Sequence, residues 1–203
     1  MVERQIERRG IDQPGLIAAM REVPRHIFVP ELRRTDAYQD VPIPIGTGQT
    51  LSQAYLSALM ISLLELDGDE RVLEIGTGSG YDAALLSKLA REVYTIEIDE
   101  NLGDQARRNL RGLGLNNVRV KIGDGYRGWP EKAPFDAILL TTAPERIPEP
   151  LFEQLKIGGK LVVAVGNLVQ DLQVITRTED GREVRKVSPV RLGTMTGEVN
   201  QRR

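Results

Sequence analysis

Residues 72–81 read VLEIGTGSGY, and this stretch decides the fold. An apolar run that holds the acid Glu74 ends at glycines spaced G-x-G-x-G, and a helical pattern over Asp82–Ala90 follows at once. The run predicts a buried parallel strand, and the glycines predict a turn too crowded for side chains. The helix that follows should begin facing a ligand. The sequence therefore predicts a strand, turn and helix whose backbone amides approach a nucleoside-bearing cofactor.

Strand and helix patterns alternate along the rest of the chain. Strands are expected at 71–75, 92–98, 118–122, 135–141 and 160–165, and helices at 82–90, 100–113 and 150–155, the last one ended by Gly158-Gly159. Two further strand patterns, 172–177 and 183–187, flank a Glu-Asp-Gly turn and predict a β-hairpin. This order predicts an α/β protein with a Rossmann-like, doubly wound, mostly parallel sheet and a C-terminal antiparallel addition. Ligands of such sheets bind at the carboxyl ends of the strands.

The first 53 residues differ in character from the rest. Short helices are expected over Val2–Arg9 and Gly15–Val23, and residues 36–53, with two prolines and two glycines, are expected to form a loop. Apolar residues at helical spacing over Gln53–Glu65 predict a helix that faces the core. We expect one domain over 1–203, with N-terminal helices and a substrate loop (1–53) before an α/β core with its hairpin (54–203).

Composition excludes several classes of protein. The chain has 203 residues, no cysteine, one histidine and a formal net charge of -2. Disulfides, cysteine nucleophiles and multi-histidine metal sites are therefore excluded, and nothing indicates nucleic acid or an anionic membrane as a partner. The N-terminus lacks the apolar region of a signal peptide, and the longest apolar stretch, 55–66, is too short to span a bilayer. We expect a cytoplasmic protein without a metal ion.

Acidic residues at strand ends indicate which cofactor is bound. The glycines also fit a dinucleotide site, and so does Glu97, which can accept hydrogen bonds from both hydroxyls of a ribose. Asp124, between two glycines, can accept from an adenine amino group, although it is also a good turn former. Glu74 suits an ammonium group and would repel a pyrophosphate. These residues together favour S-adenosylmethionine, with NAD as the alternative, and Asp99 is expected to cap the next helix.

The sequence also indicates the kind of methyl acceptor. An amine or alcohol acceptor usually needs a general base, but the only imidazole, that of His26, lies outside the α/β core. A carboxylate acceptor is already ionised at neutral pH, and a dry pocket favours its reaction with a sulfonium. Residues 42–53, PIPIGTGQTLSQ, offer neutral hydrogen-bonding side chains that would orient it. Within them, Thr50 or Ser52 is alternatively a helix cap.

Several motifs are typical of one family. They are RGI at 9–11, VPRHIFVP at 23–30, AY at 37–38, PIPIGTGQTLSQ at 42–53, VLEIGTGSGY at 72–81, GDGYRGWPEKAPFD at 123–136 and PVR at 189–191. In these motifs the chain resembles the protein-L-isoaspartate O-methyltransferases. The resemblance implies a class I methyltransferase fold and methylation, from S-adenosylmethionine, of the free α-carboxylate of L-isoaspartyl residues. It also implies damaged proteins and peptides as partners and repair through a succinimide; a monomer is expected.

The resemblance assigns roles by motif position. Ser52 matches the family's active-site serine, whose hydroxyl is expected to orient the substrate carboxylate and not to act as a nucleophile. The expected cofactor-binding residues are Thr50, Glu74, Gly76, Thr77, Gly78, Gly80, Glu97, Asp124, Gly125 and Thr196. The expected substrate-binding residues are Gln49, Thr142, Ala143 and Pro144.

The chain departs from the family pattern at three places. Ala54 stands where proline is usual, Leu192-Gly193-Thr194 replaces a run that contains a proline, and Thr142 stands where alanine is common. These departures leave open a related carboxyl methyltransferase that acts on a different protein or small-molecule carboxylate. A cofactor-binding scaffold without turnover is a further alternative.

Overall fold

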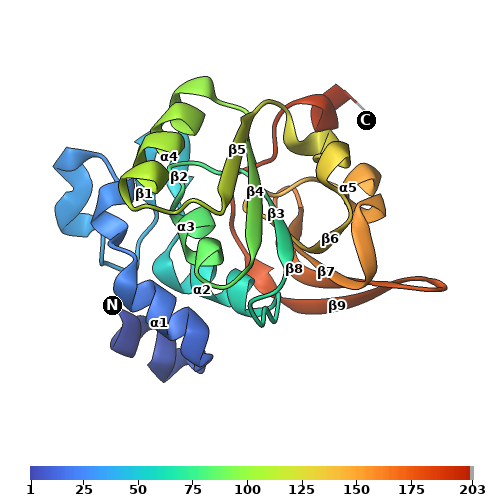
Figure 1. Cartoon of the computed structure of the whole chain (residues 1–203), viewed down its shortest axis with the longest axis horizontal. Helices are drawn as coiled ribbons and strands as arrows, with labels where there is room; N and C mark the ends of the chain where they lie inside the picture. The colour runs from blue at the N-terminus through green and yellow to red at the C-terminus, as the bar shows by residue number, and fades with distance from the viewer. Residues whose placement is uncertain (202–203) are drawn as a thin grey trace.

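A seven-stranded sheet forms the centre of the computed structural model, which describes residues 1–201 (Figure 1). Its strands lie in the order β5-β4-β3-β6-β7-β8-β9. Their bounds are β3 Arg71–Ile75, β4 Glu92–Glu97, β5 Val118–Ile122, β6 Phe135–Leu140, β7 Leu155–Gly166, β8 Gln170–Thr178 and β9 Gly181–Val190. Strands β3 to β7 pair in parallel, and β8 and β9 extend one edge with antiparallel pairing. The structure therefore confirms the predicted fold class.

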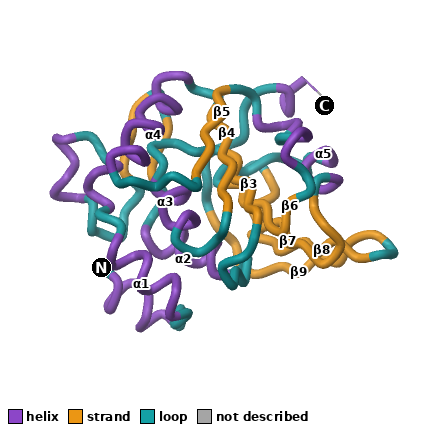
Figure 2. Tube along the Cα trace, viewed as in Figure 1, coloured by secondary structure: helices purple, strands orange, loops and turns teal. Residues whose placement is uncertain are grey.

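Helices cover both faces of this sheet. They are α1 Pro14–Glu22, α2 Ala54–Ser62, α3 Tyr81–Ser87, α4 Glu100–Gly112 and α5 Glu149–Glu153. Figure 2 shows α1 to α4 on one side of the strands and α5 on the other. Successive side chains of β3 point to opposite faces of the sheet. Val72 packs on the side of α1 to α4, and Leu73 packs on the side of α5. Asp99 caps α4, as predicted, and across residues 1–201 none of the helices is long and apolar enough to cross a bilayer.

Residues 36–53 contain a short hairpin, which corrects the prediction of a loop. Ile43–Gly46 (β1) and Gln49–Leu51 (β2) pair antiparallel across Thr47-Gly48. These two turn residues have φ values of 50° and 76°, and positive φ is what a two-residue hairpin turn of this kind needs. Alternate side chains of β1 are buried. The prolines and glycines concealed these strands, because strands usually exclude such residues.

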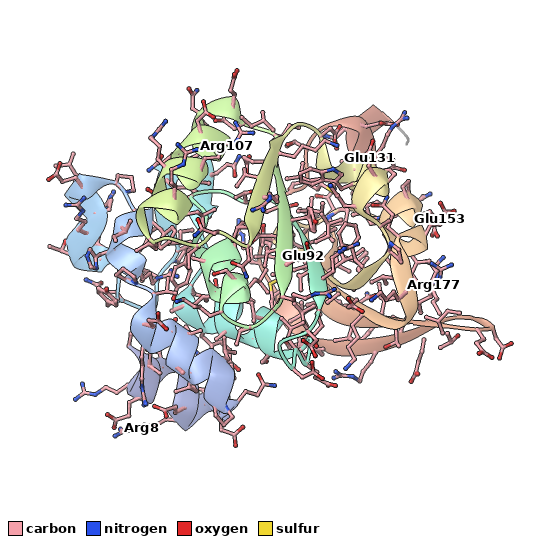
Figure 3. The ribbon with its side chains drawn as sticks, in the orientation of Figure 1. Arg8, Glu92, Arg107, Glu131, Glu153 and Arg177 are labelled. Atoms are coloured by element: carbon pink, nitrogen blue, oxygen red, sulfur yellow. The ribbon has the colours of Figure 1, made fainter. Side chains whose placement is uncertain are left out.

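The strand before the C-terminal hairpin also differs from the prediction. Gly158 and Gly159 lie inside β7 and do not end a helix. A Cβ atom at Gly159 would lie 2.8 Å from the carbonyl oxygen of Asp136, so glycine lets β7 approach β6 closely where their register shifts. Arg177 on β8 donates to the carbonyl oxygen of Glu153 at 2.8 Å. Figure 3 shows Glu153 and Arg177 near each other where α5 ends.

The path of the chain places a crevice at one edge of the sheet. From β3 the chain runs outward through β4 and β5, and it then returns to β6 on the other side of β3. The loops after β3 and β6 therefore leave adjacent strands toward opposite faces of the sheet. A ligand crevice opens at such a switch point, at the carboxyl ends of the strands.

Candidate functional site

A cavity of about 480 Å³ opens at the carboxyl ends of β3, β4 and β6. Its walls come from the β1–β2 hairpin and the residues after it, the glycine turn after β3, the end of β4, the loop after β6 and the C-terminal segment 191–196. Cavities of this size are typical of cofactor and small-molecule sites. The crevice that the strand order predicts is therefore present.

The glycine turn after β3 is hydrogen-bonded to β4 on one side and to the loop after β6 on the other. Gly76 has a φ of 95°, and its amide donates to the carbonyl oxygen of Ile96 in β4 at 2.9 Å. On its other side, the hydroxyl of Thr141 donates to the carbonyl oxygen of Gly76 at 2.6 Å. A Cβ atom on residue 76 would overlap the Thr141 hydroxyl, so glycine alone fits here.

Glu97 is fixed by protein groups at the end of β4. The side chain is buried, and its Oε2 accepts a hydrogen bond from the backbone amide of Gly78 at 2.7 Å. Its Oε1 accepts from the backbone amide of Asp99 at 3.0 Å and from Nε2 of Gln49 at 3.1 Å. The carboxyl group thus connects the glycine turn with the β1–β2 hairpin and holds one orientation in the cavity wall.

Glu74 is a buried acid behind the glycine turn. Its Oε2 accepts from the hydroxyl of Thr95 at 2.5 Å, and Thr95 accepts from the hydroxyl of Thr77 at 2.5 Å. Within residues 1–201, Glu74 Oε1 has no hydrogen-bond partner. Burial, and next the nearby charge of Asp82, raises the pKa of Glu74 well above its ordinary value. A cation placed beside this carboxyl group would favour its charged form.

Asp82 is a second buried acid, and it lines the cavity directly. Burial raises its pKa, while the nearby Ser57 hydroxyl and the charge of Arg25 act in the opposite direction. In the part of the chain that the structure describes, its Oδ1 has no hydrogen-bond partner. Within residues 1–201, Glu74 is not among the residues that line the cavity, so its predicted contact with a ligand stays a prediction. Asp82 does line it, and a buried acid oxygen that lacks a donor suits a cationic group.

Ser52 lies on the wall of the same cavity, just before α2. The N-cap of α2 is Gln53, so the alternative that Thr50 or Ser52 caps this helix is not what the structure shows. The carbonyl oxygen of Ser52 accepts a hydrogen bond from Nη2 of Arg25 at 2.5 Å. The backbone of Ser52 is therefore held in place at the cavity wall.

Most residues predicted for the site meet in this cavity. The predicted residues that line it are Gln49, Thr50, Ser52, Gly76, Thr77, Gly78, Glu97, Gly125, Thr142 and Thr196. They come from segments that are far apart in the sequence, and the parallel sheet brings their strands' carboxyl ends to one edge. The structure places these residues together, while their individual roles stay predictions.

Other predicted residues lie outside the cavity lining of residues 1–201, and the structure gives each another contact. Gly80 packs against Ala106 of α4, where a Cβ atom would lie 3.2 Å from that side chain. Ala143 is buried, and its carbonyl oxygen accepts from the amide of Met195 at 2.8 Å. The carbonyl oxygen of Pro144 accepts from an amide at the end of β7. The predicted ligand contacts of these residues stay predictions.

Asp124 connects the loop after β5 with the C-terminal segment. Its Oδ1 accepts from the amide of Tyr126 at 2.9 Å, and its Oδ2 accepts from the amide of Glu198 at 2.6 Å. A Cβ atom at Gly197 would overlap this carboxyl group. Since Thr196 lines the cavity, Asp124 holds the segment that closes over it. Its contact with an adenine amino group stays a prediction.

Comparison with known proteins shows to which family the chain belongs. The family model described as protein-L-isoaspartate(D-aspartate) O-methyltransferase matches residues 1–200. The chain belongs to this family. Its membership agrees with the motifs in the sequence and with the position of the cavity at the carboxyl ends of the strands.

Individual members of the family are similar over nearly the whole chain. The chain is 53% identical over 199 residues to protein-L-isoaspartate O-methyltransferase 2 of Shewanella sediminis, covering 97% of this chain and 82% of the relative. It is 48% identical over 203 residues to protein-L-isoaspartate O-methyltransferase of Gloeobacter violaceus, covering 99% of each. A solved structure of a protein-L-isoaspartate O-methyltransferase superposes with a TM-score of 0.89 at 29% identity, covering 98% of this chain and 67% of that one.

Sequence reasoning missed some residues of this methyltransferase site. Asp82 directly follows the glycine pattern, and an acid at that position was a signal that could have been used. Tyr81 also lines the cavity, although no role in the site was predicted for it from the sequence. Arg25 stands in a motif that marks the family, but nothing in the motif indicates which part of the fold its side chain reaches.

Proposed function

We propose that this protein-L-isoaspartate O-methyltransferase transfers a methyl group from S-adenosylmethionine to the free α-carboxylate of L-isoaspartyl residues in damaged proteins. The ester would then start repair through a succinimide. Family membership supports the proposal. The structural observation that carries it is that Ser52 shares one cavity with Asp82, a buried acid that suits a cation. A hydroxyl that can orient an anion thus lies in the same enclosed space as a group that attracts a sulfonium cofactor. We propose that residues 1–203 act as one catalytic domain.

The residues of the cavity fit S-adenosylmethionine. Among the described residues, an acid oxygen of Asp82, in the cavity wall, and one of Glu74, behind the glycine turn, lack donors; this suits an ammonium group nearby and would repel a pyrophosphate. We expect Glu97 to accept from the two ribose hydroxyls, and Gly76 and Gly78 to allow close contact with the backbone. We expect the remaining contacts from Thr50, Thr77, Gly125 and Thr196. When bound, the cofactor supplies a methyl group that is already activated by its sulfonium.

The protein's own residues have to orient the acceptor and exclude water. A carboxylate is ionised at neutral pH, so no residue has to remove a proton from it. We expect the Ser52 hydroxyl to donate to one carboxylate oxygen and to leave the other oxygen facing the methyl group. We expect Gln49 and Thr142 to form the substrate wall, and the segment around Thr196 to keep water out.

Transfer of labelled methyl groups tests the proposed function. The enzyme should label a peptide that contains one L-isoaspartyl residue and leave its aspartyl twin unlabelled, because only the first has a free α-carboxylate beside the chain. Equal labelling of both peptides, or none of the first, would contradict the proposal. A panel of other carboxylates would then test the related methyltransferase that Ala54 and residues 192–194 leave open.

Cofactor affinity should depend on pH through Glu74. S-Adenosylhomocysteine, which has the same ammonium group, should bind more tightly as the pH rises above the ordinary pKa of a glutamate side chain. Burial raises the pKa of Glu74 and a cation beside it would lower that pKa again, so binding should release a proton where the free protein holds one. In the ligand-free protein the sign is opposite: the free energy of unfolding should fall as Glu74 ionises with rising pH. Calorimetry in buffers of different ionisation enthalpy measures the proton release.

Glu74→Gln is the matched control for this titration. The variant keeps the shape of the side chain and removes its proton, so its affinity should be weaker and should not change with pH from this source. A wild-type affinity that does not change as the pH rises toward neutrality would contradict the placement of the ammonium group near Glu74.

We also propose a monomer in the cytoplasm, acting on proteins and peptides without nucleic acid or membrane as a partner. Support comes from the sequence alone, through its charge and its lack of long apolar stretches. Light scattering measures the molar mass in solution. A mass of two chains would contradict the monomer.

A further inference from the structure

Arg25 is a fully buried charged residue in the N-terminal extension. It begins the short 3-10 helix Arg25–Phe28, outside the α/β core. Its Nε donates to the carbonyl oxygen of Ala37 at 2.8 Å, and its Nη2 donates to the carbonyl oxygen of Ser52 at 2.5 Å. One guanidinium therefore joins the extension to the residue that is proposed to orient the substrate.

The same guanidinium also faces the wall of the cavity. Its central carbon lies 4.6 Å from the centroid of the Tyr81 ring. The charge of Arg25 also reaches Asp82, where it opposes the rise in pKa that burial causes. Both of these neighbours line the cavity. A buried charge is costly unless such neighbours compensate it, so Arg25 is held from two sides, by the Ser52 backbone and by the cavity wall.

We propose that Arg25 is a positioning residue, whose hydrogen bond to the Ser52 carbonyl sets the direction of the Ser52 hydroxyl in the cavity. The inference rests on the proposed function, because that function requires the hydroxyl to orient a carboxylate. A planar guanidinium holds carbonyl oxygens and an aromatic ring at fixed angles, whereas the ammonium of lysine does not. Misplacing an orienting group by about 1 Å can lower a rate about 100-fold.

A double-mutant cycle between residues 25 and 52 tests this role. Arg25→Lys should lower kcat for the isoaspartyl peptide about 30-fold in the wild-type background and less than about 3-fold in the Ser52→Ala background. The effect of Arg25→Lys on kcat should nearly disappear in the Ser52→Ala background, because Arg25 is proposed to act only through the Ser52 hydroxyl. The KM for S-adenosylmethionine should change less than about 3-fold in both backgrounds, since Arg25 does not itself line the cavity and lysine keeps the positive charge near Asp82.

Each result of the cycle decides the question. Equal reductions of kcat by Arg25→Lys in both backgrounds would mean that Arg25 supports the fold in general, and they would overturn the proposal. So would a folded Arg25→Lys enzyme with unchanged kcat, or a lysine variant that does not fold. Arg21→Lys is the matched control, because Arg21 is an exposed arginine on α1 that pairs with Glu7. It should keep the wild-type kcat.

Amide hydrogen exchange provides a readout that needs no substrate. In Arg25→Lys, the amides of residues 49–53 should exchange at least about 10-fold faster than in the wild type, while those of β4 should not change. Unchanged exchange at 49–53 would overturn the proposal. A wild-type enzyme that labels neither peptide would defeat the proposed function, and the exchange data would still decide whether Arg25 orders this segment.

Discussion

Ser52→Ala should lower kcat for an isoaspartyl peptide about 100-fold, because the acceptor carboxylate loses the donor that orients it. The dissociation constant of S-adenosylhomocysteine should change less than about 3-fold, since the substitution removes one hydroxyl from a wall built largely by other residues. Ser52 lines the cavity, and its carbonyl is held by Arg25. Its position therefore does not depend on its own hydroxyl. Single-turnover kinetics and calorimetry measure the two constants separately.

Ser62→Ala is a suitable control for this substitution. Its hydroxyl donates to the carbonyl oxygen of Leu59 at the far end of α2, so the variant loses a serine hydroxyl near the same helix without touching the cavity. It should keep the wild-type kcat. If Ser52→Ala kept it as well, the orienting role of the Ser52 hydroxyl would be wrong.

Glu97→Gln should weaken binding of S-adenosylhomocysteine about 30-fold, with a much smaller effect on kcat at saturating cofactor. A hydrogen bond to a charged acceptor contributes about 2 kcal/mol to the free energy of binding. In the variant, the amide nitrogen of glutamine is a donor, and it would face the ribose hydroxyls and the Gly78 amide, which are donors as well. The side chain is buried and fixed by the amides of Gly78 and Asp99. It therefore cannot turn away at low cost. Calorimetric titration gives the dissociation constant directly.

The other end of the same strand provides the control. Glu92 begins β4 and bonds to Arg71 at 2.9 Å, far from the cavity, and Figure 3 shows it at the sheet. Glu92→Gln changes the same functional group and should leave the cofactor's dissociation constant unchanged. Equal losses of cofactor affinity in the two variants would mean that the substitutions act through overall stability and not through ribose recognition.

The glycine turn and the parallel strands followed from the sequence. The apolar residues within 71–75, 92–98 and 118–122 located three of the parallel strands, because strands in a sheet covered by helices bury apolar side chains. Gly76 could be predicted for the same reason that the structure shows, since no side chain fits beside Thr141. The carboxyl ends of parallel strands always share an edge, so the position of the cavity followed as well.

The short hairpin and the contacts of the acids could not be predicted in this way. A strand as short as β2 has too few residues for a period to be visible, and its neighbouring prolines and glycines are typical of loops. Asp124 is a predicted ligand contact, and its oxygens accept hydrogen bonds from the amides of Tyr126 and Glu198. The second of these donors is far along the chain, and no local pattern indicates it.

The sequence by itself determined the α/β fold, the glycine turn and the acids at the strand ends, because these depend on neighbouring residues along the chain. Only the tertiary structure decided that Arg25 reaches both the Ser52 carbonyl and the wall that contains Asp82. These residues belong to three separate segments, and their meeting depends on how helices and loops pack together. The spacing of residues along the chain carries no information about such contacts. The proposed positioning of Ser52 by Arg25 could therefore be recognised only in the folded structure.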